Sequence, residues 1–212
     1  MSSAPDAPAD SVVTGRAPAV ATRKRPKPGE RRVQILQVLA EMLQQPGAER
    51  VTTAALAARL AVSEAALYRH FASKAQMFEA LIDFIESSVF GLINQIGERE
   101  PAGRARAARI VAMVLQFGEK NPGMARVMVG DALVFEHERL QQRMNQFFDR
   151  IESTLRQCLR ATTAASSTPT VDAQVAANVL TAFVVGRLQG YARSGFRRLP
   201  TEHLEASLAL ML

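Results

Sequence analysis

The sequence predicts an all-α protein with an N-terminal helix-turn-helix head and a longer C-terminal helical body. Apolar residues recur at helical spacing through most of the chain, no segment shows a credible strand pattern, and short polar turns separate the apolar stretches. We expect residues 1–27 to form a disordered basic tail, residues 28–75 the head, and residues 76–212 a body for dimerisation and partner binding.

The N-terminal segment combines a biased tail with a run of cations. Residues 1–27 are rich in Ala, Pro, Ser and Asp, a composition typical of disorder. The cations of this basic arm are Arg23, Lys24, Arg25, Lys27, Arg31 and Arg32. Because prolines and a glycine interrupt the arm, we expect it not to be helical and to bind phosphate in a salt-dependent way. A tail that only improves solubility is the alternative.

A helix is expected over residues 30–44, and a more specific pattern follows over residues 51–78. There Thr53 is placed to cap a short helix, residues 61–62 to form a tight turn, and Ser63 to cap a second helix. This spacing predicts a helix-turn-helix, whose second helix lies in the major groove of DNA.

The second helix of this pair turns Leu67 and Phe71 inward and presents a small, polar face outward. Small side chains permit close approach to the bases, and hydroxyls and cations can donate to phosphates or base edges. The candidate DNA-binding residues are Thr52, Thr53, Ser63, Glu64, Ala65, Ala66, Tyr68, Arg69, His70 and Lys74.

Two alternatives remain open for this segment. The first is a plain helical hairpin within an alanine-rich bundle. The second concerns single residues: Arg69 could pair with Glu64 or Glu79, and His70 could pack inside the head.

The rest of the chain predicts further helices. Ser73 and Gln76 have the spacing of a capping box, which would open a long helix from Lys74 to about Ile96. Later helices are expected over residues 105–118, 123–135, 137–160 and 171–194, with a loose loop over 162–170. Gly186 and Gly190 in the last of these would permit close approach of a partner helix, although a helix buried within one chain is the alternative.

The segment from Arg31 to about Ile85 resembles the N-terminal domain of the TetR family of regulators, through the run TTAALAARLAVSEAALYRHFASKAQMF. Later segments are similar to the nucleoid-occlusion members of that family: LIDFIESSV, FGEKNPG, FEHERLQQRMNQFFDRIE and LRQCLR. The resemblance implies a TetR-like homodimer on double-stranded DNA, with a four-helix interface formed by about residues 171–212. It also implies an FtsZ-type division GTPase as partner, whose polymers the DNA-bound dimer antagonises.

The same resemblance implies a partner-binding surface at Phe84, Lys120 and Asn121. Two departures bear on this surface. Lys120 replaces an arginine, whose bidentate fork lysine cannot reproduce, and Leu92 stands where a basic residue is expected. Asn121 has an equally good interpretation as a turn residue before proline.

A ligand-responsive TetR-type repressor is the alternative function. Its small-molecule pocket would be lined by Met113, Phe117, Met128, Phe135 and Phe147. Few polar residues interrupt this set, so we interpret it as ordinary core and do not expect a small-molecule effector.

Other classes of protein are disfavoured by what the chain contains. The three histidines are isolated and no catalytic or metal-binding motif occurs, so we expect no enzymatic activity, metal or cofactor. Cys158 indicates a small buried hydrophobe and a reducing compartment. We expect no membrane-spanning run or signal peptide, hence a cytoplasmic, nucleoid-associated protein. The net charge of +6 favours a polyanionic partner or an acidic protein surface, and charge alone does not choose between them.

Overall fold

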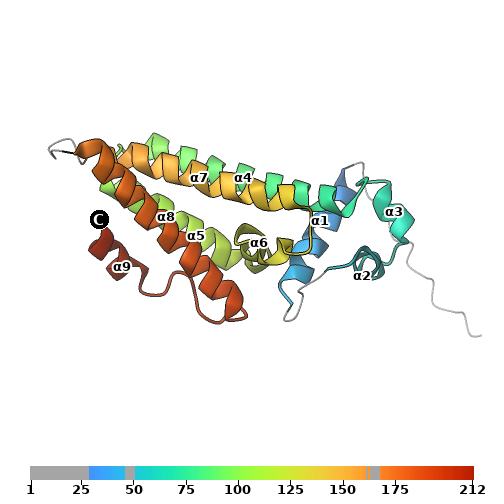
Figure 1. Cartoon of the computed structure of the whole chain (residues 1–212). Helices are drawn as coiled ribbons and strands as arrows, with labels where there is room; N and C mark the ends of the chain where they lie inside the picture. The colour runs from blue at the N-terminus through green and yellow to red at the C-terminus, as the bar shows by residue number, and fades with distance from the viewer. Residues whose placement is uncertain (1–28, 46–50, 161, 163–167) are drawn as a thin grey trace, which may run out of the picture.

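The computed structural model describes residues 29–45, 51–160, 162 and 168–212, and over these ranges it contains helices and turns but no strand (Figure 1). The helices are α1 (Glu30–Leu43), α2 (Thr53–Arg59), α3 (Glu64–Tyr68), α4 (Lys74–Arg99), α5 (Arg104–Lys120), α6 (Pro122–Met128), the 3-10 turn η1 (Asp131–Leu133), α7 (Glu138–Arg160), α8 (Pro169–Arg193) and α9 (Leu204–Met211). The all-α prediction is therefore confirmed. The expected N-terminal tail lies outside the described residues.

Two expectations about these elements were wrong, and the last helix is short. The helix expected over residues 30–44 is confirmed as α1, so Arg31 and Arg32 lie in its first turn and not in the non-helical arm to which they were also assigned. The helix expected over residues 123–135 is interrupted, because Gly130 adopts a left-handed backbone with φ of +80° and starts a separate 3-10 turn. The last helix, α9, has only eight residues.

The head lies at one end of the molecule and comprises α1, α2, α3 and the start of α4 (Figure 1). Inside it, Leu39, Leu56, Leu67 and Phe71 are each 1% exposed. α4 carries the same hydrophobic core from the head into the body. The two parts of the chain are therefore joined by continuous packing as well as by a covalent link.

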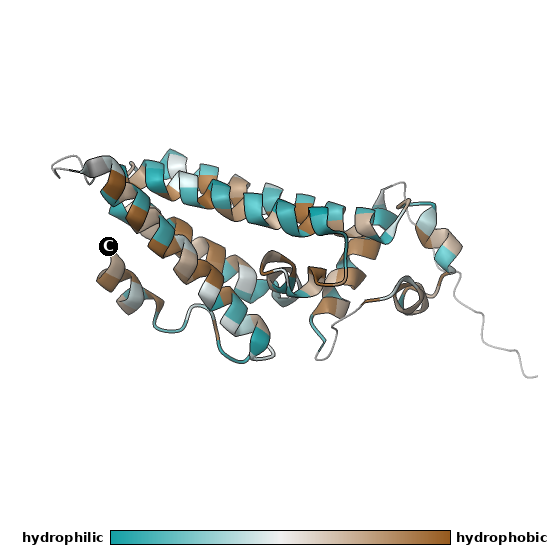
Figure 2. Ribbon diagram, in the orientation of Figure 1, coloured by the Kyte–Doolittle hydropathy of each residue, from teal (hydrophilic) through white to brown (hydrophobic). Residues whose placement is uncertain are grey.

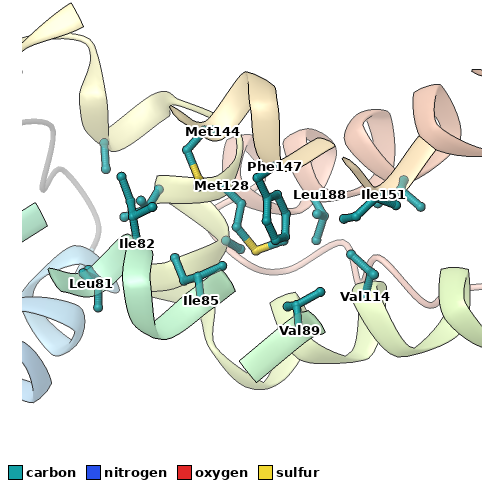
Figure 3. Close-up of a cluster of buried hydrophobic side chains, with 14 of the residues drawn as sticks. Leu81, Ile82, Ile85, Val89, Val114, Met128, Met144, Phe147, Ile151 and Leu188 are labelled. Carbon is teal, nitrogen blue, oxygen red and sulfur yellow. The ribbon is translucent and has the colours of Figure 1, made fainter. Parts of the chain in front are cut away.

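The body packs α7 against α8, with α4, α5 and α6 beside them. Figure 3 shows its centre, where side chains from five helices meet: Leu81, Ile82, Ile85, Val89, Val114, Met128, Met144, Phe147, Ile151 and Leu188. The rings of Phe90 and Phe147 meet edge to face with centroids 5.5 Å apart.

Within the described residues, one helix is long and apolar enough to span a membrane by length and composition, the stretch Thr170–Arg193 of α8. The stretch is not an unbroken apolar run, because Gln174, Asn178 and Arg187 interrupt it. α8 reaches this hydropathy because small and branched apolar residues occupy an outer side as well as the buried one (Figure 2). On that outer side Val171, Val175 and Val179 are 59%, 57% and 46% exposed.

Candidate nucleic-acid interface

Thr52, and not Thr53, caps the first helix of the helix-turn-helix. The Thr52 side-chain oxygen accepts a hydrogen bond from the backbone N–H of Ala55 at 3.2 Å. The Thr53 hydroxyl instead donates to a carboxylate oxygen of Glu64 at 2.6 Å and so links α2 to α3. The two adjacent threonines therefore have different structural roles, and the cap predicted at Thr53 was misplaced by one residue.

The turn between α2 and α3 is a Schellman motif closed by two backbone hydrogen bonds. The N–H of Val62 donates to the carbonyl of Ala57, and the N–H of Ala61 donates to that of Ala58, each at 3.0 Å. Ala61 has a φ of +53° in this motif, a left-handed conformation that favours glycine. The tight turn predicted at residues 61–62 is confirmed.

α3 has the surface expected of a recognition helix. Ser63 caps it by accepting from the N–H of Ala66 at 3.3 Å. Leu67 is buried, whereas Ala65 and Arg69 are exposed, as is Tyr68 at 45%. Among the described residues, Tyr68 and Arg69 make no side-chain hydrogen bond or ion pair, so both side chains are available to DNA. His70 is half-buried.

The connection from α3 to α4 is held by side chains as well as by backbone. The Ser73 hydroxyl accepts from the N–H of Gln76 at 3.2 Å, and the Gln76 side-chain oxygen accepts from the N–H of Ala72 at 2.9 Å. This confirms the capping box, with the return contact one residue earlier than in the usual form.

Two cations near α3 are occupied within the protein. Arg32 of α1 donates to the carbonyl of His70 and lies 4.1 Å from the centroid of the Phe71 ring. Lys74, the first residue of α4, forms an ion pair with Glu136, which lies between η1 and α7. Contact between Lys74 and DNA remains a prediction, and it would require Lys74 to share or exchange this partner.

The alternative ion pairs of Arg69 are not formed. Glu79 pairs with Arg139 at 2.7 Å, and Glu64 accepts the hydroxyl of Thr53. An arginine beside a recognition helix without a protein anion fits a phosphate contact, which remains a prediction for this chain.

The residues of the expected partner surface lie on α4 and at the α5–α6 corner. Phe84 is 49% exposed on α4, and Lys120 is exposed at the end of α5. Asn121 separates α5 from α6, and its side-chain amide donates to the carbonyl of Phe117 at 2.8 Å. Its role as a corner residue is confirmed.

A groove of about 830 Å³ lies between α4 and α5, and Phe84, Lys120 and Asn121 are not among the residues that line it. Leu92 and Ile96 of α4 line it on one side, and Met113 of α5 lines it on the other. Arg99 and Arg104 line it beside the α4–α5 connection. The groove therefore offers an apolar floor with cationic side chains at one end.

The set proposed as a small-molecule pocket does not form one. Met128 and Phe147 are buried in the core at 1% and 2% exposure, and Met113 and Phe117 pack against that core. Phe135 is 64% exposed, and its assignment to an internal pocket was wrong. The exposure of Phe135 follows from the break at Gly130, which turns the chain out of the helix.

Cys158, Glu136 and His137 have structural roles. Cys158 is buried, and burial raises the pKa of its thiol, which matches its interpretation as a small hydrophobe. Glu136 forms an ion pair with Lys74. The ring nitrogen Nδ1 of His137 accepts a hydrogen bond from the backbone N–H of Arg139 at 3.2 Å.

Sequence reasoning missed two residues that join head to body. Arg126 of α6 is 8% exposed, donates to the carbonyl of Leu43 at 3.3 Å and pairs with Asp131 at 2.5 Å. Gly123 of α6 lies against the backbone of α1. An arginine within an apolar helix and a glycine directly after a proline were the available signals.

The fold and the head together define a TetR-type helix-turn-helix regulator. Residues 35–81 match the family model described as bacterial regulatory proteins, tetR family, and residues 103–212 match the SlmA-like tetracyclin repressor-like C-terminal domain. Solved structures agree on the fold. The fatty acid degradation regulator FadR from Bacillus halodurans has a TM-score of 0.70 at 13% identity, covering 87% of this chain and 95% of its own. The regulator PfmR from Thermus thermophilus has a TM-score of 0.66 at 21% identity, covering 84% of this chain and 97% of its own.

Sequence comparison is more specific. Proteins named nucleoid occlusion factor SlmA are similar to this chain along most of its length. The relative from Idiomarina loihiensis is 48% identical over 85% of this chain and 93% of its own. The relative from Marinomonas is 50% identical over 83% of this chain and 90% of its own. The relative from Vibrio cholerae is 48% identical over 85% of this chain and 93% of its own. The chain belongs to the SlmA family of TetR-type regulators. It is thus a DNA-binding, dimer-forming protein and not an enzyme.

Proposed function

We propose that this protein is a nucleoid occlusion factor. Bound as a dimer to specific DNA sites, it engages an FtsZ-type division GTPase and antagonises its polymers over the chromosome. The observation that carries the proposal is the 48% identity to the Idiomarina relative over 182 residues, which is 85% of this chain. Such a protein acts in the cytoplasm, on the nucleoid.

The DNA contact is assigned to the outward face of α3 and the capped start of α2. Tyr68 and Arg69 project from α3 without protein partners among the described residues, and Ala65 allows close approach to the bases. The N–H groups at the capped ends of α2 and α3 suit phosphate oxygens. The remaining candidate residues support this surface or extend it.

The dimer contact is assigned to the outer side of α8. Val171, Val175 and Val179 form an exposed apolar row there, at four-residue spacing. Farther along the helix, a Cβ added at Gly186 or Gly190 would meet nothing within 4 Å in the same chain. An exposed apolar row that is followed by two glycines without side chains suits close packing against the same helix of a second copy.

The division GTPase is assigned to α4 and α5. Phe84 supplies an exposed aromatic anchor on α4, and the α4–α5 groove continues the surface through Leu92. Arg99, Arg104 and Arg109 line the groove beside the α4–α5 connection against a single anion, Glu100, so a segment with both apolar and acidic side chains fits it. Lys120 adds a cation at the other end of α5.

Binding of a fluorescently labelled FtsZ-type GTPase tests this assignment. We expect the wild-type dimer to bind it, and Phe84→Ser to weaken binding about tenfold, since loss of a buried aromatic anchor costs at least about 1.4 kcal/mol. Gln157→Ser, on the exposed face of α7, is the matched control. The proposal fails if the wild type does not bind the GTPase with or without DNA. A small molecule that releases the protein from DNA at near-stoichiometric amounts would establish the repressor instead.

A further inference from the structure

The segment from η1 to the start of α7 is fastened at both ends. At its beginning, Asp131 accepts from the buried Arg126 of α6 at 2.5 Å. At its end, Glu136 pairs with Lys74, the first residue of α4. Between them Leu133 is 4% exposed and anchors the segment in the core. The segment is thereby held in one conformation at the junction of head and body.

This fastened segment presents two apolar side chains to solvent. Val134 is 69% exposed and Phe135 is 64% exposed, although they follow each other in the chain. Nothing in the described part of the chain covers them. A rigid pair of large exposed hydrophobic residues is typical of a binding surface, because little conformational entropy is lost when it binds.

Val134, the first residue of the pair, borders a hollow of about 360 Å³ that reaches α8. Val134 lines this hollow together with Gly130 and Gln141, and α8 contributes Gln189 and Arg193. Gln189 and Arg193 are exposed and continue the outer row of α8 that runs from Val171 past Gly186. The exposed pair is therefore continuous with the face of α8 assigned to the dimer.

We propose that Val134 and Phe135 of each subunit pack into this hollow on the second copy of the chain, and so set the separation of the two DNA-binding heads. The inference rests on the α8 dimer face proposed above. A two-fold axis allows the reciprocal contact, because Val134 lines the hollow and Phe135 follows it directly in the chain, so the pair and the hollow are neighbours on each subunit. The contact is a positioning element, whereas α8 provides the main association.

The position of the segment explains why this contact affects the heads. Glu136 holds the first residue of α4, and Arg126 also donates to the carbonyl of Leu43 at the end of α1. A displacement of the segment is thus transmitted to two helices of the head. Two recognition helices read a symmetric site only at one separation, so loss of the contact relaxes the preferred half-site spacing.

Cross-linking tests the contact in the full-length protein. In a Cys158→Ser background, Phe135→Cys should give covalent dimers with a short bismaleimide, and a bulky maleimide should label it at least tenfold more slowly than in unfolded protein. Leu92→Cys, an exposed apolar residue on α4, is the control that should label fast and not cross-link. A Phe135→Cys protein that sediments as a dimer, labels fast and does not cross-link would overturn the proposal.

A second variant separates this contact from the α8 interface. Phe135→Ser should still sediment as a dimer and melt as the wild type does, but should bind duplexes with altered half-site spacing within about threefold of the best duplex. Gly186→Leu should instead give monomers, since a side chain there faces the α8 partner. Dimeric Gly186→Leu would reject the α8 interface. Unchanged spacing preference in a dimeric Phe135→Ser would reject the positioning contact alone.

Discussion

Gly123 of α6 lies so close to Ala40 of α1 that a Cβ added at Gly123 would stand 2.1 Å from the Ala40 carbonyl oxygen. This approach of helix to backbone is fixed by Arg126, three residues later, which donates to the carbonyl of Leu43 at the end of α1. The body therefore determines the orientation of the helix that supports the DNA-binding head.

Gly123→Ala should loosen this junction. The added methyl has backbone in its path, so α1 and α6 must separate, at a cost of about 1–3 kcal/mol in the free energy of unfolding. Urea denaturation measures this cost, and DNA affinity should fall with it. Gly91→Ala in α4 meets nothing within 4 Å and should stabilise the protein by about 0.5–1 kcal/mol. Equal stability of wild type and Gly123→Ala would refute the close approach.

Ala61→Gly should stabilise the head. Ala61 has a φ of +53°, which costs an L-residue about 1–2 kcal/mol and costs glycine little. The greater freedom of glycine in the unfolded chain offsets part of this gain. We therefore expect the free energy of unfolding to rise by about 0.5–1 kcal/mol, as measured by thermal unfolding. Ala58→Gly, in the regular part of α2, should have the opposite sign. A loss of stability in both variants would contradict the left-handed turn.

Tyr68→Ala should separate DNA binding from stability. Tyr68 is 45% exposed, so the variant should melt like the wild type and bind its duplex about tenfold more weakly, equivalent to about 1.4 kcal/mol. Thr52→Ala should lower both DNA affinity and stability, because removal of this helix cap costs about 1 kcal/mol in the free energy of unfolding. Fluorescence anisotropy and thermal melting measure the two effects. Wild-type DNA affinity in Tyr68→Ala would remove this residue from the interface.

Cys158 should resist alkylation in the native protein. Burial raises the pKa of its thiol, with Arg106 opposing the effect, so the thiolate is scarce near neutral pH. A pKa raised by folding means a contribution to stability that is present below the ordinary thiol pKa and is lost as pH rises through the folded value. Iodoacetamide at pH 8 should react about tenfold or more faster in urea than in buffer. Equal rates would show that the thiol is accessible.

Local patterns made part of this structure predictable. Ser63 and Ser73 were identified as caps because each precedes a helix of clear apolar periodicity. Thr52 and Thr53 could not be distinguished, since both hydroxyls are adjacent and the choice depends on how buried Val51 places the chain before α2.

Contacts between distant segments were beyond the sequence. The pair of Lys74 and Glu136 joins residues 62 positions apart, and neither local sequence points to the other. Helical spacing placed Phe135 in the core, but spacing carries no information about the left-handed Gly130 that ends the periodicity. Candidate recognition residues could be proposed from the sequence because a short helix at a cap and a turn has few possible outward positions.

The central claim is tested most directly by sedimenting FtsZ polymers formed in GTP with this protein present. A duplex selected for tight binding is compared with its scrambled sequence and with no DNA. The account predicts that polymer is lost from the pellet and that the selected duplex strengthens this loss. Unchanged polymer in the presence of a tightly bound duplex would contradict it.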